Sequence, residues 1–269
     1  MSEIISSTSN ARIKSIRKLR GRKQRDEQQV FFVEGVRIVG EALAEGWPIV
    51  ELIISPELVG DGYGRHLISE MSHKKINQLV VDSNVFRSIS TKDGPKGLAA
   101  VICQRWYPVD FILTQPGLWI CLDRIQDPGN LGTIMRTADA VGAKGLILID
   151  ECTDPYDSGS VRSSMGAIFS IPLIKTTNQD FQAFVLRNHL PVIGASDSAP
   201  LDFRLVNYAA NMILMMGSER QGLSEPLVQL STHLVSIPMA GKSDSLNLAV
   251  ATGIILYEIY NQNHPAREG

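Results

Sequence analysis

Three polar segments carry residue types and spacings that could do chemistry, and the first of them spans residues 122–132. It holds Asn130 between two glycines and leads into an apolar-faced helix that carries Arg136. A turn of this kind between a strand and a helix start is a typical ligand-binding position in α/β proteins. Asn130 could instead cap the helix. Arg136 could either be solvated or hold a phosphate.

The second segment begins where the apolar residues 212–216 end, and it contains Gly217, Ser218, Glu219 and a second glycine, Gly222. Glycine allows a backbone to approach a ligand closely. A carboxylate directly after a buried strand stands where open parallel sheets place their sites. This segment therefore predicts a binding loop.

The third segment joins a strand end to the last apolar helix, and its candidate site residues are Ile237, Met239, Ser245, Leu246 and Asn247. Asp244 or Ser245 is a natural N-cap for that helix. A cap accounts for one polar residue, so Asn247 needs another explanation.

Motifs for nucleotides, metals and disulfides are missing. No GxGxxG follows a strand and no P-loop sequence occurs. The five histidines show no metal-ligand spacing, and Cys103, Cys121 and Cys152 show no CxxC spacing. The carboxylates of residues 150–157 could bind a cation, but an exposed loop is the favoured interpretation. We expect neither a metal nor a disulfide.

Apolar runs predict the elements that would position these segments. In the second half, strands are expected at 118–122, 146–150, 191–195 and 212–216, and helices at 131–141, 161–167, 181–188 and 246–260. In the first half, strands are expected at 30–33, 49–54, 79–81 and 98–103, and helices at 34–45 and 65–73. Continuous apolar strands between helices are typical of a mostly parallel sheet that is covered on both faces.

The length of 269 residues suits two domains of about 150 residues each. We expect an N-terminal α/β domain over 1–106, a linker over 107–117, a second α/β domain over 118–262 and a tail over 263–269. No apolar run reaches the roughly 20 residues of a membrane span. Residues 1–10 lack the apolar core of a secretion signal. The expected location is the cytoplasm.

Charge is distributed unevenly along the chain. The net charge is −2, but residues 1–25, termed the basic segment, carry eight basic side chains and one acidic one, a net +7. Ile13, Ile16 and Leu19 recur every three residues and predict a helix with one apolar stripe. The basic segment suggests a polyanionic partner, with a solvated helix surface as the alternative. If it binds nucleic acid, its deletion should flatten the dependence of log K on log salt.

Together and in this order, the three segments resemble the signature motifs of the SpoU (TrmH-type) RNA methyltransferases of the SPOUT superfamily. The matching positions are Asn130, Gly132, Arg136, Thr137 and Ala138, then Gly217, Ser218, Glu219, Gly222 and Leu223, then Ile237, Pro238, Met239, Ser245, Leu246 and Asn247. Residues 161–167 also resemble a family segment. Residues 32–35 and 41–43 more loosely resemble the family's N-terminal substrate-binding domain.

The resemblance implies a smaller, ribosomal-protein-like α/β domain that binds RNA. It also implies a C-terminal SPOUT domain with a trefoil knot at about residues 211–262. The implied reaction is methyl transfer from S-adenosylmethionine to a ribose 2′-hydroxyl of RNA, by a homodimer and without a metal. Carried over by position, the cofactor contacts would be Gly217, Ile237, Met239 and Leu246. The implied catalytic set is Arg136, Asn130, Glu219, Ser245 and Asn247.

Arginine is effectively always protonated in proteins. We therefore expect Arg136 to orient a phosphate and make the hydroxyl more acidic, rather than to act as the base. The other four catalytic candidates would position Arg136, the ribose or the cofactor. The extra N-terminal domain and the basic segment favour ribosomal RNA over tRNA as the substrate. Among ribosomal RNAs, that of the large subunit is favoured. The alternatives are a tRNA 2′-O-methyltransferase and an RNA-binding protein with a vestigial catalytic domain.

Overall fold

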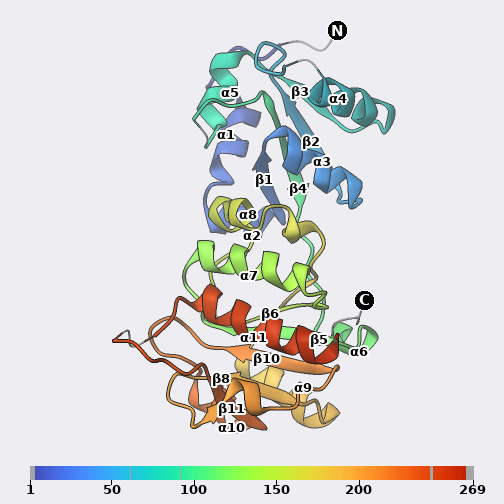
Figure 1. Cartoon of the computed structure of the whole chain (residues 1–269). Coiled ribbons are helices and arrows are strands. Elements are labelled where there is room, and N and C mark those ends of the chain that lie inside the picture. Colours follow the sequence, from blue (N-terminus) through green and yellow to red (C-terminus); the bar gives the residue numbers. More distant parts are fainter. Residues whose placement is uncertain (1–3, 61, 92, 243–244, 265–269) are drawn as a thin grey trace, which may run out of the picture. The chain divides into compact units, whose positions relative to one another are not determined.

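The computed structural model describes residues 4–60, 62–91, 93–242 and 245–264 (Figure 1). The chain divides into two compact units, one formed by residues 1–104 with 156–161 and the other by residues 105–155 with 162–269. No helix in the described ranges is both long and apolar enough to cross a membrane.

The first unit is built on a four-stranded sheet in the order β1-β4-β2-β3. Its strands are β1 (Val30–Glu34), β2 (Ile49–Ile54), β3 (Gln78–Val80) and β4 (Leu98–Cys103). Its helices are α1 (Ala11–Lys18), α2 (Arg22–Gln28), α3 (Val36–Ala44), α4 (Tyr63–His73) and α5 (Ser83–Ile89). β4 is antiparallel to both β1 and β2, whereas β2 and β3 are parallel. A small mixed sheet with helices agrees with the α/β architecture expected for the N-terminal half.

The basic segment is part of the core of this unit rather than a free extension. Asn10 caps α1, and Ile13, Ile16 and the following Leu19 are at most 6% exposed in a core that they share with α5. Arg25 is 4% exposed and donates to two main-chain carbonyl oxygens. Burial of three aliphatic side chains contributes about 5 kcal/mol. Deletion of residues 1–25 would therefore unfold the unit instead of testing its charge.

A short stretch from the second half of the sequence belongs to the first unit. Tyr156 is 1% exposed, and its ring centroid lies 4.7 Å from that of Phe31 and 6.4 Å from that of Trp47. Asp157 accepts a hydrogen bond from the buried Arg25 at 3.4 Å. The first unit therefore takes part of its core from residues far downstream in the chain.

The second unit is built on a seven-stranded sheet in the order β7-β6-β5-β10-β8-β11-β9. Its strands are β5 (Leu118–Asp123), β6 (Gly145–Ile149), β7 (Leu173–Thr176), β8 (Val192–Ala195), β9 (Leu201–Asp202), β10 (Met212–Met216) and β11 (His233–Ser236). All pairings between these strands are parallel, which confirms the expected sheet type. The loops after β5, β10 and β11 therefore leave the sheet at the same edge, where open α/β sheets bind ligands.

Helices cover both faces of this sheet (Figure 1). They are α6 (Phe111–Thr114), α7 (Pro128–Ala140), α9 (Asn178–Asn188), α10 (Glu225–Leu230) and α11 (Leu248–Asn263). Short 3₁₀ turns lie at Ala167–Phe169 and Phe203–Leu205. Helix α8 (Ser158–Ser163) begins in the first unit and ends in the second. Phe181 of α9 and Leu227 of α10 share a core with Trp119 of β5. Side chains alternate along a strand, so Ile120 and Leu122 point to the opposite face, where α7 and α11 lie.

The last part of the chain returns to the face that carries α7. After β10 it passes through α10 and β11, and then α11 packs along α7. A Cβ atom placed on Gly253 would lie 3.8 Å from Cγ2 of Thr137, so the two helices approach closely there. This return brings the start of α11 to the start of α7. The trefoil knot implied for residues 211–262 stays a prediction.

Several elements differ from the sequence-based expectation. The expected linker at 107–117 contains α6, and the peptide N–H of Tyr107 donates to the carbonyl of Leu173 at 2.9 Å. The helix expected at 161–167 lies at 158–163 instead, because Met165 and Gly166 take positive φ angles of 51° and 97°. β7 and β11 each hold only two apolar residues, Leu173 with Ile174 and Leu234 with Val235, and so short a run does not predict a strand. Residues 265–269 of the expected tail lie outside the described ranges.

Candidate functional site

The loop after β5 places Asn130 in the first turn of α7. Pro128 occupies the start of the helix, where a missing N–H costs nothing. Asp127 caps the helix, since its carboxylate accepts a hydrogen bond from the peptide N–H of Asn130 at 2.7 Å. The interpretation of Asn130 as the cap is therefore wrong. Its side-chain amide is left to bind other partners.

The side chain of Asn130 joins the three polar segments. Its Oδ1 accepts a hydrogen bond from Nδ2 of Asn247 at 2.9 Å, and its Nδ2 donates to Oε1 of Glu219 at 2.9 Å. We term Asn247, Asn130 and Glu219 the Asn–Asn–Glu relay. Each segment contributes one side chain to it, so the loops after β5 and β10 and the start of α11 are held together.

Glu219 is the final acceptor of the relay. Its carboxylate also accepts hydrogen bonds from the peptide N–H groups of Gln126 at 3.3 Å and Asp127 at 3.4 Å. Partial burial raises the pKa of Glu219, but hydrogen bonds from Asn130 and from main-chain N–H groups outweigh it and hold the pKa below its ordinary value. The ionised carboxylate therefore ties the first segment to the second at neutral pH.

Asn247 has two tasks. Its Oδ1 accepts hydrogen bonds from the peptide N–H groups of Ala249 and Val250 at 2.9 and 3.2 Å, so it is the N-cap of α11. The expectation of a cap at Asp244 or Ser245 is wrong; Ser245 precedes the cap, and Asp244 lies outside the described residues. One side chain thus both caps α11 and reaches the relay.

Arg136 and Ser245 stand apart from the relay. Arg136 is exposed on α7, and within the described ranges its guanidinium makes no hydrogen bond or ion pair. Ser245 is also exposed, and its side chain makes no hydrogen bond to another described residue. A guanidinium presents five N–H donors. Arg136 is therefore available to an anion that this chain does not itself supply.

The four residues expected to contact a cofactor lie in loops at the carboxyl edge of the sheet. Gly217 follows β10 and Ile237 follows β11, and these strands flank β8. Ile237 and Leu246 are half-buried, and 42% of Met239 is exposed. The main chain of residues 239–242 makes no hydrogen bond within the described structure. Apolar side chains beside open peptide groups fit a flat ring with polar edges, and no hydrogen bond joins the four residues to one another within the described ranges.

The turn after Gly217 is closed so tightly that only glycine fits there. Ser218 and Gly222 exchange main-chain hydrogen bonds at 3.1 and 3.0 Å. A Cβ atom on Gly217 would overlap the main chain of Gly222 and Leu223. Gly222 itself has φ +64°, a conformation that favours glycine. Both glycines of the second segment therefore shape the loop that presents Glu219.

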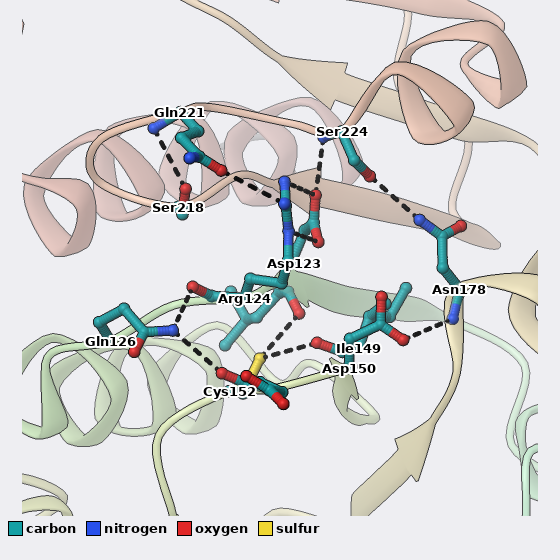
Figure 2. A network of polar contacts seen from close by, with 12 residues as sticks. Asp123, Arg124, Gln126, Ile149, Asp150, Cys152, Asn178, Ser218, Gln221 and Ser224 are labelled. Atoms are coloured by element: carbon teal, nitrogen blue, oxygen red, sulfur yellow. Dashed lines mark hydrogen bonds and ion pairs between the residues drawn. The ribbon is translucent and has the colours of Figure 1, made fainter.

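A second polar network holds the same loop, and the sequence analysis missed it (Figure 2). Asp123, at the end of β5, is fully buried, and its carboxylate accepts hydrogen bonds from Nε of Arg124 at 3.0 Å and from the peptide N–H of Ser224 at 2.7 Å. Nη1 of Arg124 also donates to Oε1 of Gln221 at 3.3 Å. The signal in the sequence is a carboxylate that ends an apolar strand, since buried carboxylates are rare unless paired.

The acidic cluster and the cysteines have structural partners. Asp150 accepts a main-chain hydrogen bond at 3.0 Å, and Asp157 pairs with Arg25. Within the described ranges, no group of three or more His, Cys, Asp or Glu side chains could hold a metal ion. Cys121 and Cys152 are buried and form no disulfide within the described ranges, and Sγ of Cys152 donates to the carbonyl oxygens of Leu122 and Ile149, both at 3.2 Å. Burial raises the pKa of both thiols, to about 11 for Cys152. These protonated thiols are poor nucleophiles.

Two family models match the chain. The model of the SpoU rRNA Methylase family matches residues 117–257, and that of the MRM3-like substrate binding domain matches residues 10–100. The first match contains the relay, the tight turn and Arg136. The second match covers most of the first unit.

Known proteins resemble the chain over nearly its whole length. A 23S rRNA (uridine(2479)-2′-O)-methyltransferase of Streptomyces viridochromogenes is 32% identical over 96% of this chain and 92% of its own. The 23S rRNA (guanosine(2553)-2′-O)-methyltransferase RlmP of Bacillus subtilis is 27% identical over 95% and 98%. The crystal structure of an AdoMet-bound rRNA methyltransferase from Sinorhizobium meliloti is 36% identical, covers 98% of this chain and 99% of its own, and has a TM-score of 0.88.

Proposed function

The chain belongs to the SpoU rRNA methylase family, and on that premise we propose that it is an S-adenosylmethionine-dependent methyltransferase of a ribose 2′-hydroxyl in RNA. The observation that carries the proposal is the Asn–Asn–Glu relay, which gathers one side chain from each signature motif at the ligand-binding edge of the sheet. A vestigial catalytic domain would have no need to keep all three partners.

Ribosomal RNA is the favoured substrate class. The first unit matches a substrate-binding domain, and full-length relatives carry names of 23S rRNA methyltransferases. These similarities support an RNA of the large ribosomal subunit over tRNA, and with it a cytoplasmic location. They leave the nucleotide open, because relatives modify a uridine in one case and a guanosine in another.

The residues proposed to hold S-adenosylmethionine are Gly217, Ile237, Met239 and Leu246. The three apolar side chains would pack against its adenine ring, and the open peptide groups near Met239 would bind the edge of the ring. When bound, S-adenosylmethionine supplies a sulfonium methyl group, which is already activated for displacement. Because Gly217 has no side chain, S-adenosylmethionine could approach the backbone of this turn closely.

Arg136 is proposed to act on the RNA. Its exposed guanidinium, free of partners in the described chain, would bind the phosphate next to the reacting ribose and make the 2′-hydroxyl more acidic. The proton would pass to a phosphate oxygen or to water, because arginine stays protonated. We propose that the relay of Asn130, Glu219 and Asn247 positions the loops around the reacting groups. Ser245, next to the start of α11, is proposed to help position the ribose or the cofactor.

Arg136→Ala should strongly lower the rate of methyl transfer without unfolding the protein. The measurement is transfer of labelled methyl groups from S-adenosylmethionine to total RNA from cells that lack this activity. Loss of one charged donor at a reacting centre typically costs about 100-fold to 1,000-fold in rate. Arg187→Ala is the matched control, since Arg187 is an exposed arginine of the same unit on α9. We expect it to retain full activity.

The location of the label tests the rest of the proposal. Label in a large rRNA that resists alkaline cleavage at one ribose supports both the reaction and the substrate class. Label in tRNA would keep the reaction but overturn the assignment to ribosomal RNA. Absence of transfer together with absence of S-adenosylmethionine binding would favour the vestigial, RNA-binding alternative.

We further propose that the second unit forms a homodimer through the outer face of α7 and α11. Val250, Ile254 and Tyr257 form a stripe on α11 at helical spacing, and they are 51%, 36% and 50% exposed. Neighbouring α7 presents Arg136 on its own exposed face. An apolar stripe of this kind on a soluble unit is typical of a protein interface. It supports a site in which Arg136 lies beside a second copy of the chain.

The double variant Ile254→Asp/Tyr257→Asp should therefore be a folded monomer with reduced methyl transfer. Two buried, unpaired carboxylates would cost a dimer interface several kcal/mol. Light scattering after size-exclusion chromatography gives the mass, and Leu186→Asp, at a 64% exposed apolar residue of α9, is the control. A double variant that keeps the mass of a dimer would contradict this interface.

A further inference from the structure

The charges of the basic segment fall into two groups. Arg12, Arg22, Lys23 and Arg25 pair with carboxylates, namely those of Glu51, Asp26, Glu27 and Asp157. Lys14 and Lys18 are exposed on α1 and make no ion pair within the described ranges. About half of the segment's charge is thus compensated inside the unit, and the remainder is not.

Two of the uncompensated cations are fixed where α1 packs against α5. Arg17 on α1 and Arg20 just after α1 bridge to the end of α5. Nη2 of Arg17 donates to Oγ of Ser88 at 3.1 Å and to the carbonyl of Thr8 at 3.2 Å. Nη2 of Arg20 lies 3.1–3.4 Å from the carbonyl oxygens of residues 88–90. These acceptors are neutral, so they fix both guanidinium groups in place without cancelling their charge.

No carboxylate opposes this charge from either helix. The sequences of α1 and α5 contain no Asp or Glu, and α5 adds the exposed Arg87. Two carboxylates flank these elements, and each accepts hydrogen bonds from α5 or from the residues directly after it. Asp82 caps α5 at 2.7 Å, and Glu34, only 6% exposed, accepts hydrogen bonds from Ser90 and Thr91 at 2.7 and 3.0 Å.

We propose that Lys14, Arg17, Lys18, Arg20 and Arg87, termed the α1–α5 face, bind the sugar–phosphate backbone of the RNA substrate. This inference rests on the proposed function, which supplies RNA as the occupant. Cations that are fixed by neutral acceptors or extend freely from a helix attract phosphates without reading base identity. The face therefore supplies affinity and orientation, and the nucleotide is selected elsewhere.

The test removes the three cations of the α1–α5 face that have no structural partner, in the variant Lys14→Ala/Lys18→Ala/Arg87→Ala. The probe is a transcript of large-subunit ribosomal RNA, and its affinity is measured from 0.1 to 1 M salt. Three lost phosphate contacts should lower the slope of log K against log salt by about 2, which is about 100-fold in affinity at 0.1 M. KM for the transcript should rise, while kcat at saturating RNA stays unchanged.

The matched control removes three exposed cations of the same unit that are paired with carboxylates, in the variant Lys23→Ala/Arg37→Ala/Lys74→Ala. It changes the net charge equally and should change the slope by less than about 1. Equal slopes in the two triple variants would overturn the inference, because only net charge would then matter. An unchanged slope in the α1–α5 variant would overturn it as well.

The same experiment separates this inference from the proposed function. A wild-type protein that binds the transcript through the α1–α5 face but transfers no methyl group would refute the reaction and support the face. A protein that methylates the transcript with a KM unaffected by the α1–α5 variant would support the reaction and refute the face.

Discussion

Glu219→Gln is expected to lower the rate of methyl transfer by about 100-fold to 1,000-fold while the protein remains folded. Glu219 accepts hydrogen bonds from the side chain of Asn130 and from the peptide N–H groups of Gln126 and Asp127. A glutamine amide has one oxygen, so its NH₂ end would face an N–H donor. The loop of the second segment would then separate from the first, and the site would lose its geometry.

The control for this variant is Glu225→Gln, which neutralises an exposed carboxylate on α10 that bonds only Gln229 among the described residues. Steady-state methyl transfer and thermal unfolding are measured for both variants. We expect a near wild-type unfolding temperature for Glu225→Gln, a lower one for the still folded Glu219→Gln, and a lost rate only at Glu219. Wild-type kinetics for Glu219→Gln would refute the role of the relay.

Acid should reproduce the effect of this variant. The folded-state pKa of Glu219 lies below its unfolded value, so its contribution to stability is present above the unfolded pKa and is lost as pH falls through the folded pKa. Protonation converts one acceptor oxygen into a donor, as glutamine does. The wild-type and Glu219→Gln proteins should therefore converge in stability at low pH.

Gly217→Ala is expected to weaken S-adenosylmethionine binding by at least about 100-fold and to destabilise the second unit by about 3 kcal/mol. The added Cβ atom would overlap the main chain of Gly222 and Leu223, which cannot move away as a flexible side chain would. The hydrogen bonds between Ser218 and Gly222 would have to break. Calorimetric titration with S-adenosylmethionine and thermal unfolding measure the two effects.

Gly241→Ala is the control for that variant. Gly241 lies in the third segment, and no described residue would come within 4 Å of an added Cβ atom. Because this substitution meets no steric barrier among the described residues, we expect little change in the free energy of unfolding. Equal behaviour of the two alanine variants would show that the turn at Gly217 tolerates a side chain.

The sheet of the second unit could be predicted because its strands are apolar runs with clear ends. The expected 118–122 and 212–216 correspond to β5 and β10, and parallel pairing follows from apolar faces on both sides. The position of α8 could not be predicted, since it depends on positive φ angles at Met165 and Gly166 that apolar periodicity does not encode. The apolar stripe of the basic segment could be predicted from Ile13, Ile16 and Leu19, but not that it packs against α5, because that contact joins distant parts of the sequence.

The candidate site could be predicted as three segments but not as a bonded network. Asn130, Glu219 and Asn247 stand far apart in the sequence, and only the return of α11 to α7 makes them neighbours. The caps at Asp127 and Asn247 follow local geometry, which decides between adjacent polar residues that look equivalent in the sequence. Asp123 was missed because its partner Ser224 belongs to another loop.

The inclusion of residues 156–161 in the first unit has a consequence for the order in which the protein matures. A nascent chain that has emerged only up to residue 104 holds the whole sheet of that unit but lacks Tyr156, whose ring fills the core beside Phe31. The ribosome must therefore synthesise β5, α7 and β6 before the N-terminal half can finish folding. The first unit is therefore translated first, but it completes its core only after residues 156–161 have been translated.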